Sequence, residues 1–121
     1  MTTLYESTFI SVGASAEAAL EDNFLITFGE GAPQDVAEYC FIHRPVINTG
    51  EIATGATLSI GGQSWPVTAI GEVAAENLRE LGHITLQFDG AAQAEFPGMI
   101  HVAGPVPATV RPGQTFRIVS H

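Results

Sequence analysis

The sequence predicts an all-β fold: a small closed or nearly closed β-barrel with one or two short helices. Short apolar runs alternate with polar residues along most of the chain, and thirteen glycines and seven prolines interrupt them with turns. A small sheet must also close or cover its edges, which favours a barrel. The length of 121 residues is typical of one domain, so residues 1–121 are expected to form a single unit.

The clearest strand covers 83–88, where Ile84, Leu86 and Phe88 alternate with polar residues. Two glycines between 57–60 and 64–70 predict a tight hairpin, and a proline at position 66 places its second strand at an edge or a bulge. Further strands are expected over 4–12, 24–28, 39–43, 99–103 and 115–119.

Two short helices are expected. Ser15 is a suitable N-cap for a helix that runs to about Leu20. The segment 73–81 predicts a second helix, since its apolar residues share one side and Glu72, Glu76 and Glu80 recur on the other. Gly82 would then be the left-handed residue that follows the helix.

The net charge of the chain excludes some classes of binding partner. It contains no lysine and has a formal net charge of −9, so a surface that follows nucleic-acid phosphates is excluded and an anionic membrane would repel it. A basic protein partner would be attracted, although an acidic surface also simply favours solubility. There is no signal peptide and no apolar run of about 20 residues, and Cys40 is the only cysteine. These features predict a soluble, cytoplasmic protein without direct membrane insertion.

His43 is the foremost candidate for chemistry. It ends the apolar run 39–43 and is followed by Arg44 and Pro45. A neutral imidazole at the end of a strand suits a nucleophile, a general base or a metal ligand, and the simpler alternative is a histidine that caps the strand by hydrogen bonding. For His83 and His101, an exposed or hydrogen-bonded structural role is the simpler interpretation.

The sequence gives little support for a zinc site, a catalytic cysteine or a nucleotide-binding site. Cys40 and His43 form a lone C-x-x-H without a second pair of ligands, which only weakly supports zinc. In a strand the two residues would point to opposite faces, so a Cys–His catalytic pair is disfavoured. The sequence has no nucleotide-binding loop and no hydrolase motif.

Several stretches in order resemble the glucitol/sorbitol-specific IIA component of the bacterial phosphotransferase system (PTS). They are L-I-T-F at 25–28, E-Y-C-F-I-H at 38–43, N-L-R-E-L-G-H at 77–83, F-D-G at 88–90, A-E-F-P-G at 94–98 and H-V-A-G-P-V-P at 101–107.

The resemblance implies a phosphoryl carrier that takes a phosphoryl group from the histidine of HPr and passes it to the IIB part of a transporter. The carrier residue of the family matches His43. Arg44, His83 and His101 are candidates for stabilising the phosphoryl group, and no cofactor or metal is implied. Because two partners must reach His43, we expect it to be accessible to solvent within a shallow apolar rim.

Two alternatives from other classes stay open at this point. One is a small ligand-binding barrel without chemistry, in which His43 is structural. The other is a metal-dependent enzyme that uses His43, His83 and His101 as ligands.

Overall fold

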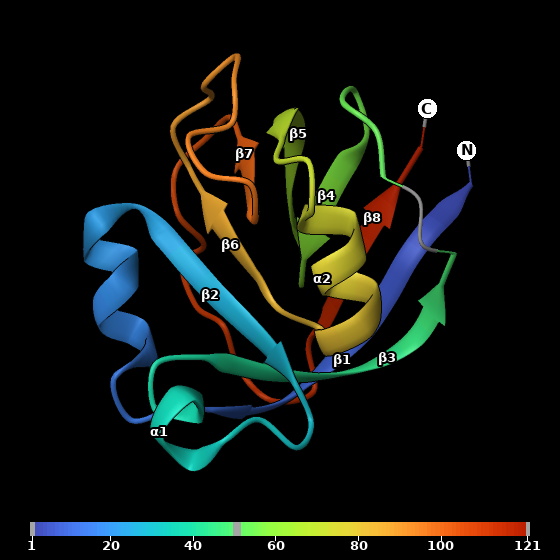
Figure 1. The fold of residues 1–121 in the computed structure, drawn as a ribbon. Coiled ribbons are helices and arrows are strands. Elements are labelled where there is room, and N and C mark those ends of the chain that lie inside the picture. Colours follow the sequence, from blue (N-terminus) through green and yellow to red (C-terminus); the bar gives the residue numbers. More distant parts are fainter. Residues whose placement is uncertain (1, 50–51, 121) are drawn as a thin grey trace.

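The computed structural model describes residues 2–49 and 52–120, which form a closed eight-stranded β-barrel (Figure 1). The predicted fold class is confirmed. The strands are β1 (Thr3–Val12), β2 (Phe24–Gly29), β3 (Phe41–Asn48), β4 (Thr57–Ile60), β5 (Gln63–Ile70), β6 (Ile84–Gln87), β7 (Met99–Val102) and β8 (Thr115–Val119). The helices are η1 (Ala16–Asp22), α1 (Gln34–Ala37) and α2 (Ala74–Leu81).

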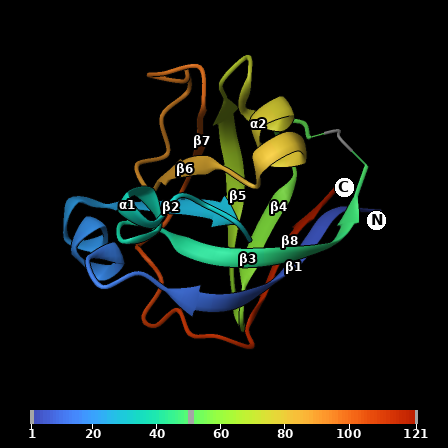
Figure 2. The same cartoon turned by 60° about the horizontal axis from the view of Figure 1, so that its bottom comes forward.

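The order around the barrel is β1-β3-β2-β6-β7-β5-β4-β8, and β8 pairs with β1 to close it (Figure 2). The β2–β3 and β6–β7 pairs are parallel, whereas the other neighbours are antiparallel. Each described strand therefore has a partner on both sides, which removes the open edges that promote aggregation.

β3 is longer than the sequence predicted. The apolar run does not end at His43, because the strand continues through Pro45 to Asn48. A register shift against β1 accommodates the proline, and β2 pairs with β3 only as far as His43. The missing N–H of Pro45 therefore leaves no ladder bond to β2 unmade.

The predicted hairpin is confirmed, since β4 and β5 pair antiparallel across Gly61 and Gly62. The alternative of an edge position for Pro66 is wrong, because β5 also pairs with β7. The pairing of β5 with β7 has a register irregularity just after Pro66, between Val67 and Ala69. This irregularity agrees with the other predicted position for the proline, a β-bulge.

The second predicted helix is confirmed as α2, and Gly82 follows it in the left-handed conformation with φ of 67°. The first is a 3₁₀ helix, η1, which begins one residue after Ser15. Ser15 does not cap it, since its hydroxyl donates to Glu38 Oε2 over 3.1 Å. The single turn α1 was not predicted.

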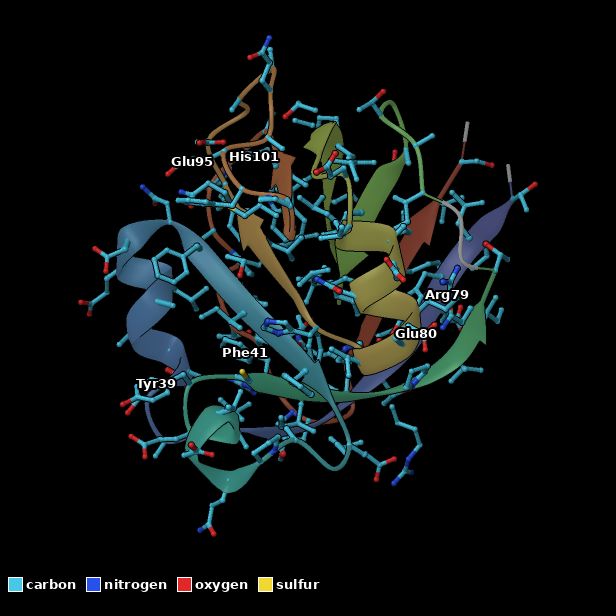
Figure 3. All side chains as sticks on the ribbon, viewed as in Figure 1. Tyr39, Phe41, Arg79, Glu80, Glu95 and His101 are labelled. Atoms are coloured by element: carbon cyan, nitrogen blue, oxygen red, sulfur yellow. The ribbon has the colours of Figure 1, made fainter. Side chains whose placement is uncertain are left out.

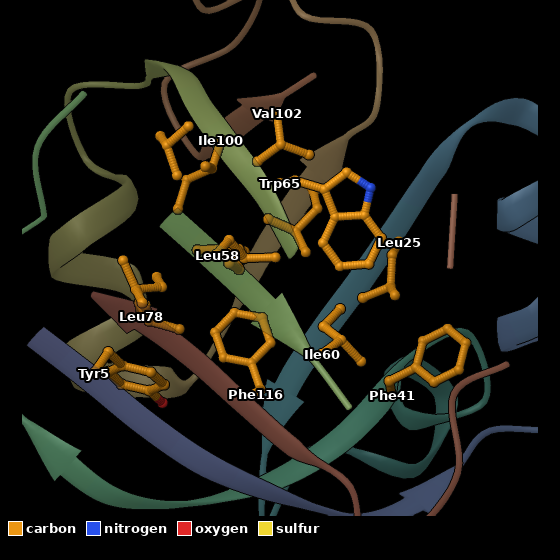
Figure 4. Packing of buried hydrophobic residues seen from close by; sticks show 14 of the residues in the cluster. Tyr5, Leu25, Phe41, Leu58, Ile60, Trp65, Leu78, Ile100, Val102 and Phe116 are labelled. Carbon is orange, nitrogen blue, oxygen red and sulfur yellow. The ribbon is translucent and has the colours of Figure 1, made fainter. Parts of the chain in front are cut away.

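The core fills the barrel with large side chains from most strands (Figure 4). Phe9 and Phe116 meet edge to face with ring centroids 5.9 Å apart, and Leu78 adds a fully buried side chain from α2. Burying such a side chain contributes about 1.5–3 kcal/mol. Because α2 supplies part of this core, the segment that follows it is held firmly against the strands.

The two ends of the described chain lie side by side, as both views show (Figures 1 and 2). The Ser120 N–H donates to the Thr2 carbonyl over 2.8 Å, which extends the pairing of β8 with β1. No helix within residues 2–49 and 52–120 has the length and apolar character needed to cross a membrane.

Gly71, which lies between β5 and α2, is predicted to be essential for stability. Its N–H donates to the Met99 carbonyl over 2.7 Å, and a Cβ at this position would strike the Pro97 carbonyl. Gly71→Ala should therefore lower the free energy of unfolding by about 1–3 kcal/mol, measured by urea denaturation. Gly62→Ala is the control, because a Cβ there meets nothing within 4 Å. Equal stability of the two variants would contradict the prediction.

Candidate functional site

His43 lies inside the barrel, fully buried, on the middle of β3. Its ring is surrounded by Tyr5, Phe9 and Phe116, whose ring centroids lie 6.0, 6.1 and 5.8 Å away. Alternation along the strand explains the position, because Phe41 and His43 share the inner face. The imidazole is thus part of the core.

Both ring nitrogens of His43 are hydrogen-bonded. Nε2 lies 2.7 Å from the carbonyl oxygen of Gly82, and Nδ1 lies 2.7 Å from the hydroxyl of Ser7. A carbonyl only accepts, so the proton is on Nε2, and the Ser7 hydroxyl donates to Nδ1 of the neutral ring. Burial lowers the pKa of His43, and the bond to Gly82 only partly opposes this effect. The ring is therefore neutral and has no free lone pair.

The expectation that His43 is accessible to solvent is wrong for this structure. It rested on a strand that ends at His43, and the continuation of β3 instead encloses the ring between β1 and β2. The predicted shallow apolar rim is absent around His43, because the apolar side chains next to its ring belong to the closed core of the barrel. The carrier role that the resemblance implies for His43 stays a prediction, and it requires the ring to be uncovered.

Arg44 lies away from this site. Its guanidinium is exposed and binds Glu30 with two bonds, 2.6 Å from Nε to Oε1 and 2.9 Å from Nη2 to Oε2. The hydrogen bond from Arg44 lowers the pKa of Glu30. As the next residue along β3, Arg44 points to the outer face, so it does not accompany His43 as a phosphoryl-stabilising group.

His83 lies between Gly82 and β6 and is partly exposed. Its Nδ1 donates to the carbonyl of Thr27 over 3.0 Å, so Nδ1 carries a proton and Nε2 points away from this bond. The ring also packs against Phe28, with centroids 4.9 Å apart. His83 is therefore oriented by β2.

Thr27 links the surroundings of His43 and His83 by hydrogen bonds. Its hydroxyl donates to the Gly82 carbonyl over 2.9 Å, so this oxygen accepts from both Thr27 and His43. The same hydroxyl accepts from the Ile84 N–H over 3.3 Å. The buried ring of His43 and the accessible ring of His83 thus lie on two sides of one backbone segment, 82–84.

A hollow of about 430 Å³ opens beside His83. Apolar side chains from β2, β7 and the loop before β7 line it together with polar ones, among them Phe24, Asn77, Thr85, Gln87, Phe96 and Met99. Phe96 is 58% exposed, so the hollow has an apolar rim at the surface. A protein partner could place a reacting group against this imidazole.

His101 is fully buried on β7 and orders the loop between β6 and β7. Its Nδ1 lies 2.8 Å from Asp89 Oδ1, and its Nε2 accepts from the Glu95 N–H over 3.1 Å. Glu95 and His101 lie beside each other in Figure 3. Desolvation would raise the pKa of Asp89, but the bonds from His101 and the Ala91 N–H outweigh it and lower that pKa. His101 is hydrogen-bonded through both ring nitrogens, and its candidate role in stabilising the phosphoryl group stays a prediction.

The three histidines do not converge on one point. His43 binds Ser7 and Gly82, whereas His101 binds Asp89 and Glu95. Within the described part of the chain no three His, Cys, Asp or Glu residues are grouped as metal ligands. Cys40 is buried, and burial raises the pKa of its thiol. The arrangement therefore gives no geometric support to the metal-dependent alternative.

The sequence contained a signal for the polar partners that was missed. Ser7 falls between Tyr5 and Phe9 on the inner face of β1, and Thr27 follows Leu25 on the inner face of β2. A polar residue in the buried register of an alternating strand needs a hydrogen-bond partner inside. Both residues are fully buried, and both serve the segment that carries the histidines.

Comparison with known proteins identifies the family. The profile described as "PTS system glucitol/sorbitol-specific IIA component" matches residues 4–117. The chain belongs to this family. It is 53% identical over 120 residues to glucitol/sorbitol-specific EIIA components of Shigella flexneri and Escherichia coli (strain K12), covering 99% of this chain and 98% of each relative. The predicted resemblance is confirmed, and this IIA component is a phosphotransferase component that carries phosphoryl groups within the PTS cascade.

The fold of this IIA component also has a solved counterpart. A PTS IIA component from Enterococcus faecalis V583 superposes with a TM-score of 0.82, covering 94% of this chain and 98% of that chain. The two are 22% identical, so the likeness establishes the barrel alone.

The buried neutral state of His43 predicts a loss of stability in weak acid. Because its pKa is lowered in the folded protein, the unfolded chain binds the proton first as the pH falls below about 6.5. The melting temperature should fall from pH 6.5 to pH 5, and His43→Gln, which cannot titrate, should show a shallower slope. All other titratable groups are present in both proteins, so the difference between the two slopes reports on His43. Parallel curves would contradict the assignment.

Proposed function

We infer that this IIA component accepts a phosphoryl group from HPr in the cytoplasm and passes it to the IIB component of a glucitol/sorbitol membrane transporter. The observation that supports this most strongly is the match over 99% of the chain to proteins named glucitol/sorbitol-specific EIIA components. The transported polyol would be selected by the membrane part of the transporter.

The chemistry of the barrel suits this role. Transfer between two protein nucleophiles depends on positioning and on donors for the phosphoryl oxygens. The Thr27 carbonyl orients the ring of His83, and amide and hydroxyl groups line the hollow beside it, where they can bind phosphoryl oxygens.

His43 is the carrier residue that the resemblance implies, and it can react only if one of its ring nitrogens is released from its hydrogen bond. Its Nε2 becomes available only if the Gly82 carbonyl moves away, and its Nδ1 only if the Ser7 hydroxyl does. Either change leaves buried polar groups without partners, at about 1–3 kcal/mol for each group. Phosphorylation of His43 at Nε2 therefore demands an opening of segment 82–84, which the bonds of Thr27 oppose, whereas phosphorylation at Nδ1 demands a movement of Ser7.

Phosphoryl transfer can be tested directly. The intact chain, mixed with phosphoenolpyruvate, enzyme I and HPr, should gain one phosphoryl group by intact-mass analysis at neutral or alkaline pH. Adding the IIB component should then discharge it, because IIB is the proposed acceptor. A reaction without HPr is the control and should give no transfer. A chain that stays unmodified in the complete mixture would contradict the proposed function.

The charge of the protein predicts how HPr binds. With a net charge of −9 and no lysine, it should attract a basic face of HPr. The association rate, measured by stopped flow, should fall as salt rises toward about 0.1 M, where the Debye length is about 10 Å. The dissociation rate should change less.

HPr and IIB should also compete, since both must reach the same imidazole. Titration of a preformed complex with IIB should displace HPr rather than add to it. An association rate indifferent to salt would restrict the charge to a role in solubility, and a stable ternary complex would contradict a shared site.

A further inference from the structure

The hydroxyl of Tyr5 is buried without a hydrogen-bond partner. Within residues 2–49 and 52–120 it is the one buried side-chain nitrogen or oxygen in this condition, and the residue is 2% exposed. An unpartnered buried hydroxyl destabilises a fold, and a phenylalanine of nearly the same shape would avoid that cost. A tyrosine at this position is therefore expected to serve a state of the protein other than the resting one.

Tyr5 lies directly beside the ring of His43. Their ring centroids are 6.0 Å apart and the ring planes meet at 61°. Tyr5 also contacts Phe116, at 5.9 Å between centroids, and the two rings lie next to each other in Figure 4. Alternation along β1 places Tyr5 on the same inner face as Ser7, whose hydroxyl holds Nδ1 of His43. The unpartnered hydroxyl thus belongs to a side chain that packs against the imidazole.

A phosphoryl group on His43 would need hydrogen-bond donors in these surroundings. It carries negative charge on oxygens that accept hydrogen bonds, and the rings around His43 are largely apolar. The hydroxyls of Ser7 and Thr27 already donate, to Nδ1 of His43 and to a backbone carbonyl. Among the described hydroxyls near this ring, that of Tyr5 is the one not yet committed to an acceptor.

The phenol of Tyr5 is suited to donating. Burial raises the pKa of Tyr5, so the hydroxyl keeps its proton. Its hydrogen can rotate about the C–O bond toward an acceptor that arrives beside the ring. A hydrogen bond from a neutral hydroxyl to an anionic oxygen is also stronger than one between neutral groups, and low polarity around it strengthens it further.

We propose that the Tyr5 hydroxyl donates a hydrogen bond to an oxygen of the phosphoryl group carried by His43. The proposal rests on the carrier role proposed above for His43, and it makes Tyr5 a catalytic residue of the transfer. The lone pair of the released His43 nitrogen attacks phosphorus of the donor phosphohistidine and forms a new N–P bond. The donor N–P bond breaks, and its electron pair returns to the donor imidazole. Tyr5 keeps its proton throughout.

The ring proton of His43 is accounted for whichever nitrogen is released. With Nδ1 released, the proton stays on Nε2 at the Gly82 carbonyl. With Nε2 released, its proton passes to solvent and Nδ1 takes one up, which the Ser7 hydroxyl can accept. In both cases the new bond from Tyr5 offsets part of the free energy that the release costs.

The test compares Tyr5→Phe with Tyr39→Phe, since the chain has two tyrosines and Tyr39 is exposed. Phenylalanine keeps the ring and removes only the hydroxyl. In single-turnover transfer from phospho-HPr, Tyr5→Phe should be slower by about 10–100-fold, and Tyr39→Phe should match the wild type. The urea midpoint of unphosphorylated Tyr5→Phe should equal that of the wild type or exceed it, because the hydroxyl has no bond to lose.

A second measurement uses the wild-type chain alone. Tyrosine isotopically labelled at Cζ gives one NMR signal for Tyr5 and one for Tyr39. Phosphorylation through enzyme I and HPr should move the Tyr5 signal downfield, as for a phenol that begins to donate, and leave the Tyr39 signal in place. Tryptic digestion at alkaline pH should locate the phosphoryl group in fragment 1–79, where His43 is the only histidine, because trypsin spares the Arg44–Pro45 bond.

The outcomes separate this proposal from the carrier function. A wild-type chain that takes up no phosphoryl group would reject both. Uptake with the label in 80–117, or uptake by Tyr5→Phe at the wild-type rate, would overturn the role of Tyr5 and leave the carrier function standing. A slower transfer that accompanies a lower urea midpoint, or an equal loss in Tyr39→Phe, would also overturn it, since either result would indicate a structural effect.

Discussion

The carbonyl oxygen of Gly82 is the point on which the arrangement of this IIA component depends. It accepts hydrogen bonds from the buried His43 ring and from the Thr27 hydroxyl. It also belongs to the left-handed residue that ends α2, where a Cβ would approach His43 Nε2 within 3.0 Å. Through this oxygen, the end of the helix that contributes Leu78 to the core is joined to both β2 and β3.

Three histidines show how strongly position determines chemistry. His43 and His101 are both fully buried, and each has both nitrogens engaged. His83 is partly exposed, and its Nδ1 is engaged by the Thr27 carbonyl, while its Nε2 has no partner among residues 2–49 and 52–120. The same side chain is thus a core group in two places and a partly exposed group in the third. Counting partners for each ring nitrogen separates these roles better than the local sequence does.

Much of the barrel could be predicted because strand alternation and turn glycines are local signals. The hairpin at Gly61 and Gly62, strand β6, and helix α2 with Gly82 all followed from spacing. The accessibility of His43 could not be predicted in this way. Whether β3 ends or continues at Pro45 depends on a register shift against β1, and that shift is set by strands far away in the sequence. Non-local pairing likewise brings Thr27 and Gly82 together, 55 residues apart.

The adjacent ends of the chain have a consequence for how such a barrel can be built into larger proteins. Because Thr2 and Ser120 are hydrogen-bonded neighbours, a short connection between them would close the chain into a ring without moving a strand. The turn at Gly61 and Gly62 would then be a natural place for new ends, since its tip is exposed and a Cβ at Gly62 meets no neighbour. A carrier of this shape can be inserted into a loop of a longer polypeptide as easily as it is attached at one end, because the host chain leaves it where it entered.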